Sequence, residues 1–336
     1  MPAGAVKVRM QPARIVSRRD RPELFAAWEA SAAFAAGERH PVHGRFGRQY
    51  YPATFACRDL SFAVVRNDEP LLLARCNLLD GLLGYFGMPI RLVLSHDAAD
   101  EASGFAVRDA CAALDELARA SGASAVVLRD DEGAPEAPAL GRAAAGFGAT
   151  AETRLTGTCD LHLDEAAIRR HLRKSYHSLV NWGRRNLRLV YVNQANPAPD
   201  LYGSYRDFHA RVAGRVTRPP ESWEAMYRWI VAGGGELALA YLDDGALVAA
   251  TVSVDGSEIT YYASGVYDRE RFDRPLAHWP LFDAIQRSRA RGLCQFDLGD
   301  LPEKGTAGDK EFNIGYFKRG FATAIPTHRV WRWTIR

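Results

Sequence analysis

The sequence is poor in cysteine, and none of its cysteines forms a C-x-x-C pair. The five are Cys57, Cys76, Cys111, Cys159 and Cys294, an odd number scattered over 336 residues. Their spacing indicates neither a disulfide framework nor a zinc site. We therefore expect buried thiols and no metal.

Long apolar runs and several well-known catalytic motifs are also absent. No stretch approaches the roughly 18 apolar residues of a membrane span, and the first 20 residues lack a signal-peptide core. We therefore expect a cytoplasmic protein without a membrane span. The absence of G-x-S-x-G, H-E-x-x-H and P-loop patterns disfavours serine hydrolase, zincin and NTPase functions.

The overall composition is that of a folded globular protein. Hydrophobic residues make up 47% and charged residues 25% of a chain about twice the usual domain length, which predicts two domains. The net charge of +3 is too small to indicate nucleic-acid binding by itself, and no DNA partner is predicted.

Lysine is scarce as well, which draws attention to where it occurs. The chain has 38 Arg and 5 Lys, and Lys304, Lys310 and Lys318 lie within fifteen residues of one another. An ammonium differs from a guanidinium as a compact charge whose pKa shifts on burial. The segment around these lysines is therefore a candidate for part of a functional site.

Two similar series of elements follow one another along the chain. In the first half, periodicity and turn signals predict a helix over 21–36, a Gly/His/Arg-rich loop over 37–52, strands over 61–67, 70–76 and 84–95, a helix over 103–121, a strand over 124–130, a helix over 138–146 and a strand over 150–163. In the second half they predict a basic helix over 164–186, a strand over 187–193, helices over 198–214 and 220–232, three antiparallel strands over 236–267, a helix over 275–292, a strand over 294–299, a helix over 308–320 and a strand over 324–336.

Three strands, helix, strand, helix and strand thus occur twice, offset by roughly 170 residues, which indicates a duplicated domain. The predicted fold class is α/β (α+β), with domains at 1–162 and 163–336. Each is expected to have a mixed, mainly antiparallel sheet flanked by helices.

Three segments of the second half carry a resemblance to a known family. They are LRKSYHSLVNWGRRNLRLVYV (172–192), FHARVAGRVTRPPESW (208–223), and FDLGD (296–300) followed by EFNIGYFKRGF (311–321). These segments resemble the FemAB-like branch of the GNAT acyltransferase superfamily. The resemblance covers about 150–330, and the first half only by architecture. It implies tandem GNAT-like domains, the first degenerate, and transfer of an acyl or aminoacyl group to an amine.

Lys318 is the first catalytic candidate. The Phe317-Lys318 pair matches the FK of the family, whose lysine is implicated in the transfer step, so the resemblance implies a catalytic Lys318 and a substrate-binding Phe317. Aminolysis of an ester or thioester passes through an oxyanion that a fixed cation stabilises. The alternative is that Lys318 only caps a helix before Gly320.

Asp297 and His278 are further catalytic candidates. Asp297 and Asp300 bracket Gly299 just after a predicted strand, where a carboxylate could orient an acceptor amine or accept its proton. The alternative for each is a turn aspartate. His278 begins a predicted helix, where simple packing is the alternative.

The remaining candidates are substrate-binding residues. Arg215 and Arg218 lie close in sequence to the aromatic Trp223, a combination that suits recognition of a phosphate or carboxylate. The alternative is a solvated loop. Tyr261 and Tyr262 are neighbours on a predicted strand, so only one of the two side chains can face a cleft, and we predict that it is Tyr262. The predicted substrate-binding set is His209, Arg215, Arg218, Trp223, Tyr262, Asp300, Asp309 and Phe317.

The acyl donor stays open between acyl-CoA and aminoacyl-tRNA. Many GNAT enzymes hold CoA pyrophosphate on a glycine-rich loop, whereas the segment SGVYDRERFDRPLAH (264–278) has one glycine. A basic helix could attract tRNA, although most charge runs are solvated faces. Its basic residues are Arg169, Arg170, Arg173, Lys174, Arg184, Arg185 and Arg188.

We expect no tightly bound cofactor. The expected acceptor is a saccharide, peptide or other small-molecule amine of cell-envelope metabolism. The rival function is a non-catalytic binding protein in envelope-polymer assembly.

Overall fold

The chain divides by its internal contacts into two compact units. The computed structural model describes residues 13–96, 100–131, 134, 136–305 and 308–336. Unit 1 consists of Met1–Ala36, Cys57–Glu152 and Arg329–Arg336, and unit 2 consists of Gly37–Ala56 and Thr153–His328. The units are therefore not the two halves of the sequence. The domain boundary after residue 162 stays a prediction.

Unit 1 combines two sets of strands with helices. The first set is β1 (Arg14–Ser17), β3 (Phe62–Arg66), β4 (Glu69–Ala74) and β7 (Leu92–Leu94), antiparallel throughout. The second runs in the order β8 (Ala125–Asp131), β6 (Leu82–Gly84), β5 (Asn77–Leu79) and β2 (Arg58–Asp59). The helices are α1 (Pro22–Ala30), α3 (Asp100–Ser121) and α4 (Ala137–Gly146). The 3-10 segment η1 (Ala32–Glu38) follows α1, and its last two residues belong to unit 2.

Unit 2 is built on one mainly antiparallel sheet. Its strand order is β10 (Arg188–Val192), β11 (Gly235–Tyr241), β12 (Leu247–Asp255), β13 (Ile259–Tyr267), β14 (Gln295–Asp300) and β9 (Thr150–Asp160), and only the β13–β14 pair is parallel. β9 and β15 (Thr327–Thr334) each have residues in both units.

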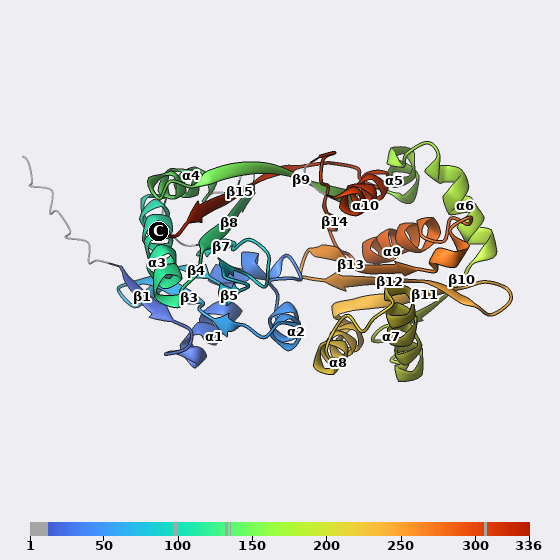
Figure 1. The fold of residues 1–336 in the computed structure, drawn as a ribbon, viewed down its shortest axis with the longest axis horizontal. Helices are drawn as coiled ribbons and strands as arrows, with labels where there is room; N and C mark the ends of the chain where they lie inside the picture. Colours follow the sequence, from blue (N-terminus) through green and yellow to red (C-terminus); the bar gives the residue numbers. More distant parts are fainter. Residues whose placement is uncertain (1–12, 97–99, 132–133, 135, 306–307) are drawn as a thin grey trace, which may run out of the picture. The chain divides into compact units, whose positions relative to one another are not determined.

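Helices cover both faces of the sheet of unit 2 (Figure 1). Packed on one face are α2 (Gly47–Thr54), α7 (Pro199–Ala213) and α8 (Pro220–Trp229), followed by the π-turn η2 (Ile230–Gly234). Packed on the other are α5 (Glu165–His171), α6 (Tyr176–Asn186), α9 (His278–Ala290) and α10 (Asp309–Arg319). The 3-10 turn η3 (Arg269–Arg271) precedes α9. The predicted α/β class, with mainly antiparallel sheets flanked by helices, is confirmed.

The predicted basic helix over 164–186 is wrong in one respect, because it is two helices. The chain leaves the helical conformation at Leu172, and the N–H of Arg173 donates to the carbonyl of Gly320 at 2.9 Å. A Cβ at position 320 would lie 2.2 Å from the ring of Tyr176, so Gly320 lets that ring pack onto the chain just after α10. The break between α5 and α6 therefore supports the end of α10.

Two other predictions need correction in the first half of the sequence. The predicted loop over 37–52 contains the helix α2, because Phe46 and Tyr50 pack against the buried ring of Trp229 with centroids 6.0 and 5.9 Å away. The predicted strand over 84–95 turns back on itself between β6 and β7, where Phe86 has a positive φ of 50°.

The five cysteines are all free, but two of them are not buried as predicted. Cys57 and Cys294 are partly exposed, whereas Cys76, Cys111 and Cys159 are buried. No helix among the described residues is long and apolar enough to cross a membrane. In the same part of the chain, no three His, Cys, Asp or Glu side chains form a group that could hold a metal ion.

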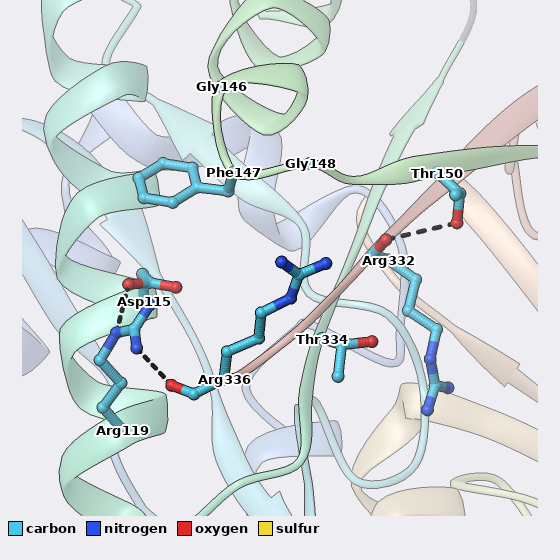
Figure 2. A pocket seen from close by; sticks show the side chains of 9 residues that line it. All are labelled: Asp115, Arg119, Gly146, Phe147, Gly148, Thr150, Arg332, Thr334 and Arg336. Carbon is cyan, nitrogen blue, oxygen red and sulfur yellow. Dashed lines mark hydrogen bonds and ion pairs between the residues drawn. The ribbon is translucent and has the colours of Figure 1, made fainter.

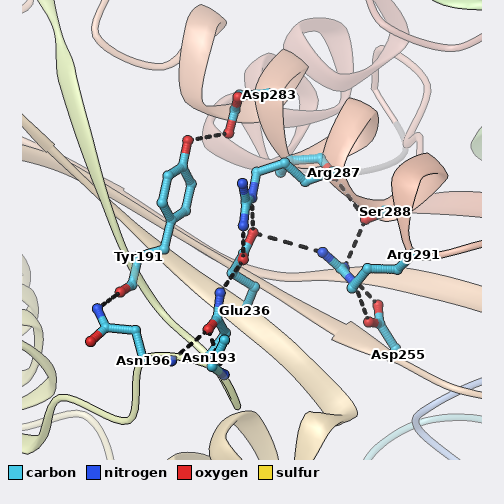
Figure 3. Close-up of polar contacts among 11 residues, drawn as sticks. Tyr191, Asn193, Asn196, Glu236, Asp255, Asp283, Arg287, Ser288 and Arg291 are labelled. Atoms are coloured by element: carbon cyan, nitrogen blue, oxygen red, sulfur yellow. Dashed lines mark hydrogen bonds and ion pairs between the residues drawn. The ribbon is translucent and has the colours of Figure 1, made fainter.

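A partly buried polar network fastens α9 to the sheet of unit 2 (Figure 3). Glu236, only 5% exposed, accepts hydrogen bonds from Nε and Nη2 of Arg287 and from Nδ2 of Asn193. The Tyr191 hydroxyl donates to Asp283 at 2.9 Å, and the Arg287 guanidinium lies over the Tyr191 ring. The network fixes α9, whose residues pack against β14.

We predict that Asp283→Asn stabilises the protein at alkaline pH. Burial raises the pKa of the Asp283 carboxyl to about 6, although Tyr191 and Arg287 oppose that shift. The folded state thus holds a proton that the unfolded chain releases near pH 3.8, and stability falls as pH rises through this window. We expect the variant to exceed wild type by about 1–3 kcal/mol at pH 8 and by less at pH 4.

Urea unfolding at both pH values measures this difference. The exposed Asp243, changed to Asn, is the control. A stabilisation by Asp283→Asn that is the same at pH 4 and pH 8 would contradict the prediction.

Candidate active site

Strands β13 and β14 run side by side for only three residues and then separate. Their parallel pairing joins Ile259–Tyr261 to Gln295–Asp297. Beyond it, β13 continues along β12 to Tyr267, whereas β14 continues along β9 to Asp300. The C-terminal end of β14 is thereby freed from β13, at a position where open sheets generally present ligand-contacting groups.

Gly299 lies at this freed end and leaves room beside the strand. Its φ of 83° belongs to the left-handed region that favours glycine. Its N–H donates to Oδ1 of Asp297 at 2.6 Å. A Cβ at position 299 would lie 3.1 Å from Nζ of Lys318. The absence of a side chain therefore lets the ammonium approach the strand.

Lys318 comes from the last turn of α10 and is half-buried. Burial lowers the pKa of its ammonium, while the charges of Asp297 and Asp300 oppose that shift. Its Nζ lies 5.7 Å from the ring centre of Tyr262, whose hydroxyl is 2.6 Å from that of Tyr267. The ring of Tyr262 therefore faces the lysine. Three predicted residues, Tyr262, Asp297 and Asp300, thus act on the ammonium of Lys318.

Asp297 is a buried residue, 7% exposed as a whole, and its carboxylate has a partner that the sequence did not reveal. Its Oδ2 lies 3.0 Å from Nε2 of His40, whose ring is 5.4 Å from that of Tyr261. His40 lies before α2 but belongs to unit 2. The one signal that could have pointed to it was the Gly/His/Arg-rich composition of residues 37–52.

A second group of predicted residues lies between α7 and α8. The ring of His209 is 5.3 Å from that of Trp223, and the Arg218 guanidinium lies over Trp223 at 5.0 Å. Burial and then the charge of Arg218 lower the pKa of His209. Tyr205, packed on Trp223, places its hydroxyl 3.3 Å from Oγ of Ser264 on β13. This group is therefore joined to the sheet, three residues beyond the point where β13 leaves β14.

His278 and Phe317 lie in an aromatic cluster. The ring of His278 is 4.5 Å from that of Tyr176 and 5.3 Å from that of Phe317, which packs on Phe321 at 5.2 Å. Burial lowers the pKa of His278 to about 4, so its imidazole is neutral at pH 7. These contacts favour packing over proton transfer for His278.

The other predicted residues are more open to solvent. Asp300 is half-exposed and lies 3.8 Å from Nε2 of the buried His328. Arg215 is exposed in the loop before α8, and Asp309 is exposed in the first turn of α10. The structure thus gathers Lys318, Asp297, Asp300 and Tyr262, and holds Arg215 and Asp309 at the surface.

Unit 1 contains a pocket of about 630 Å³ that none of the predicted residues lines. At its rim Arg119 donates to Asp115 at 2.8 Å and to the backbone oxygen of Arg336 at 2.7 Å. Figure 2 shows the Arg336 side chain projecting towards Phe147 and Gly148. The predicted site residues therefore all belong to unit 2, and none of them lines this pocket.

The second half of the chain matches a known family. The family model described as acetyltransferase (GNAT) domain matches residues 166–313. This segment is a GNAT domain. The match contains Asp297, Asp300 and the β13–β14 divergence, and it ends before Lys318. No curated protein matches the chain by sequence.

Several solved structures, one of them a tandem GNAT protein, resemble nearly the whole chain. FemX superposes with a TM-score of 0.60 at 13% identity, over 88% of this chain and 94% of that one. A tandem GNAT protein from the clavulanic acid biosynthesis pathway gives 0.60 at 15%, over 97% and 99%. L-PGS from Bacillus licheniformis gives 0.57 at 12%, over 95% and 93%. At such low identities, the structural similarity shows the fold alone. That fold is the predicted tandem GNAT architecture, which is confirmed.

We predict that a methyl group at position 299 displaces the ammonium of Lys318. Gly292→Ala is the matched control, because Gly292 has a φ of 85° but its added methyl group would meet no atom within 4 Å. Backbone strain should lower the free energy of unfolding by about 1–2 kcal/mol in both variants. Only Gly299→Ala should shift the Lys318 signal.

Isotope-edited NMR of the lysine Cε groups measures this shift, and the chain has only five lysines. Assignment uses Lys318→Arg. An unmoved Lys318 signal in Gly299→Ala would show that the ammonium does not lie against the strand.

Proposed function

We propose that this protein is an acyl- or aminoacyltransferase whose reaction centre lies where β13 and β14 separate. The observation that supports it most is the half-buried ammonium of Lys318 beside Gly299, with the carboxylate of Asp297 on the same strand. The GNAT domain match and the tandem GNAT fold support the class of reaction.

The proposed reaction transfers an acyl group from the oxygen or sulfur of the donor to the nitrogen of the acceptor. The acceptor amine attacks the carbonyl carbon of the donor, a C–N bond forms, and the carbonyl oxygen becomes an oxyanion. Lys318 stabilises that negative charge, and Asp297 accepts the proton that the amine nitrogen loses. The C–O or C–S bond of the donor then breaks, and the leaving group takes up a proton.

Two donor classes fit this chemistry, an acyl-CoA thioester and an aminoacyl-tRNA ester. The GNAT match favours acyl-CoA, which would be a substrate and not a bound cofactor. The FemAB-like resemblance and the basic helices α5 and α6 favour aminoacyl-tRNA. Both donors are cytoplasmic molecules, so the proposal places the reaction in the cytoplasm. The proposed acceptor is an amine of an envelope saccharide or peptide.

We predict that Lys318→Ala lowers kcat about 10²- to 10³-fold, the usual loss when one donor to an oxyanion is removed. Lys310→Ala is the matched control, because Lys310 lies on the same helix and is exposed. Single-turnover transfer from acetyl-CoA and from a charged tRNA pool to an amine panel measures the effect. Full activity of a folded Lys318→Ala protein would refute the role of the lysine.

Donor binding separates the two classes and also tests the rival function. Calorimetry with acetyl-CoA and filter retention of charged tRNA measure the two affinities for wild type, and the donor of the reaction should be the one that binds. Binding of one donor without turnover on any acceptor would favour a non-catalytic binding protein.

A further inference from the structure

A segment from the first part of the sequence is fastened to the turn between β12 and β13. The N–H groups of Ser257 and Ile259 donate to the carbonyls of Glu38 and Arg39 at 2.9 and 3.1 Å. A Cβ at position 256 would lie 2.3 Å from the Arg39 carbonyl oxygen, so this close approach requires Gly256. The residue that follows Arg39 is thereby held beside the sheet.

That residue is His40, and its ring is oriented from both sides. The N–H of Val42 donates to Nδ1 of His40 at 3.2 Å. Nδ1 is therefore the acceptor nitrogen, and a neutral imidazole with an acceptor at Nδ1 carries its hydrogen on Nε2. Nε2 lies 3.0 Å from Oδ2 of Asp297, to which it donates. The two side chains are only 12% and 10% exposed.

The two oxygens of Asp297 thus receive different donors. Oδ1 accepts the N–H of Gly299, and Oδ2 accepts Nε2–H of His40. One donor comes from the same strand and the other from a segment more than 250 positions earlier in the sequence. Because the two donors reach different oxygens from different directions, they fix the plane of the carboxylate.

We infer that His40 is a positioning residue for Asp297, so that the reaction centre of the second GNAT domain includes a side chain from the first part of the sequence. The catalytic consequence of this inference rests on the proposed function, whereas the tautomer of His40 and its contact with Asp297 are independent of that function. His40 holds the carboxylate in the orientation that accepts the amine proton and does not itself take that proton. Its Nδ1 is engaged by Val42 and its Nε2 by Asp297.

The surroundings of His40 include other titratable groups. The ring of His43 is 6.1 Å away on the same segment, and Tyr261 is 5.4 Å away on β13. The Arg39 guanidinium is paired with Glu258 at 2.8 Å. A rate profile against pH would mix these groups, so the test uses substitution and NMR instead.

The first measurement is independent of any activity. In ¹⁵N–¹H spectra of the histidine rings, His40, assigned with His40→Gln, should show an acceptor-type Nδ1 and a protonated Nε2. Asp297→Asn should shift the Nε2 signal of His40 and leave that of the exposed His162 unchanged. A protonated Nδ1, or no response to Asp297→Asn, overturns the inference even if transfer is detected.

The second measurement compares two substitutions of the ring. His40→Phe keeps a ring but removes the donor, and we expect kcat to fall about 10- to 100-fold with little change in KM. His40→Gln keeps an N–H donor at a similar reach and should restore most of that loss. Equal losses in both variants would point to packing and overturn the inference.

A double-mutant cycle decides whether His40 acts through Asp297. In the Asp297→Asn background, His40→Phe should have almost no further effect on kcat, because the positioned group is already lost. Fully additive losses overturn the positioning role. If no donor and acceptor pair gives transfer, the proposed function fails, while the NMR result still decides the contact between His40 and Asp297.

Discussion

The candidate site depends on keeping an ammonium ion partly out of water. Removing a charge from solvent is costly unless opposite charge or hydrogen bonds compensate. For Lys318, burial lowers the pKa, and the two nearby carboxylates oppose the loss of charge. Gly299 provides the space in which the ammonium meets the strand. Without the carboxylates, the same burial would lower the pKa of the ammonium further.

The rest of unit 2 positions the two elements that meet at this ion. The break between α5 and α6 supports α10, since Arg173 donates from its backbone to Gly320 and from its side chain to the carbonyl of Tyr316. The network around Glu236 ties α9 to β10 and β11, and α9 in turn packs on β14. The helix that carries the cation and the strand that carries the carboxylate are thus fixed by separate contacts.

The sequence predicted most of the fold because the signals that define helices and strands are local. Apolar segments separated by Asp-Gly turns marked β11 to β13, and Gly214 with the following prolines separated α7 from α8. The errors occurred where a distant partner decides the structure. The ring of Trp229 stabilises α2, and the carbonyl of Gly320 interrupts the basic helix. No window of neighbouring residues contains that information.

The candidate site, too, could be predicted only where its residues stand in local sequence motifs. Lys318 and Asp297 were found because each stands in a recognisable segment, FKRGF and FDLGD. His40 stands in a loop whose composition suggests only a turn, and its partner lies 257 positions away.

The contrast between His278 and Lys318 shows how the surroundings select a role. Both are ionisable side chains presented by helices on the same face of the sheet, and burial disfavours the charged form of each. His278 has aromatic rings around it and the positive charge of Arg173 nearby, so little compensates the burial. Lys318 has carboxylates. Residue type alone could not separate these two candidates, whereas the sign of the neighbouring charge does, and it favours Lys318 as the cation that meets a developing oxyanion.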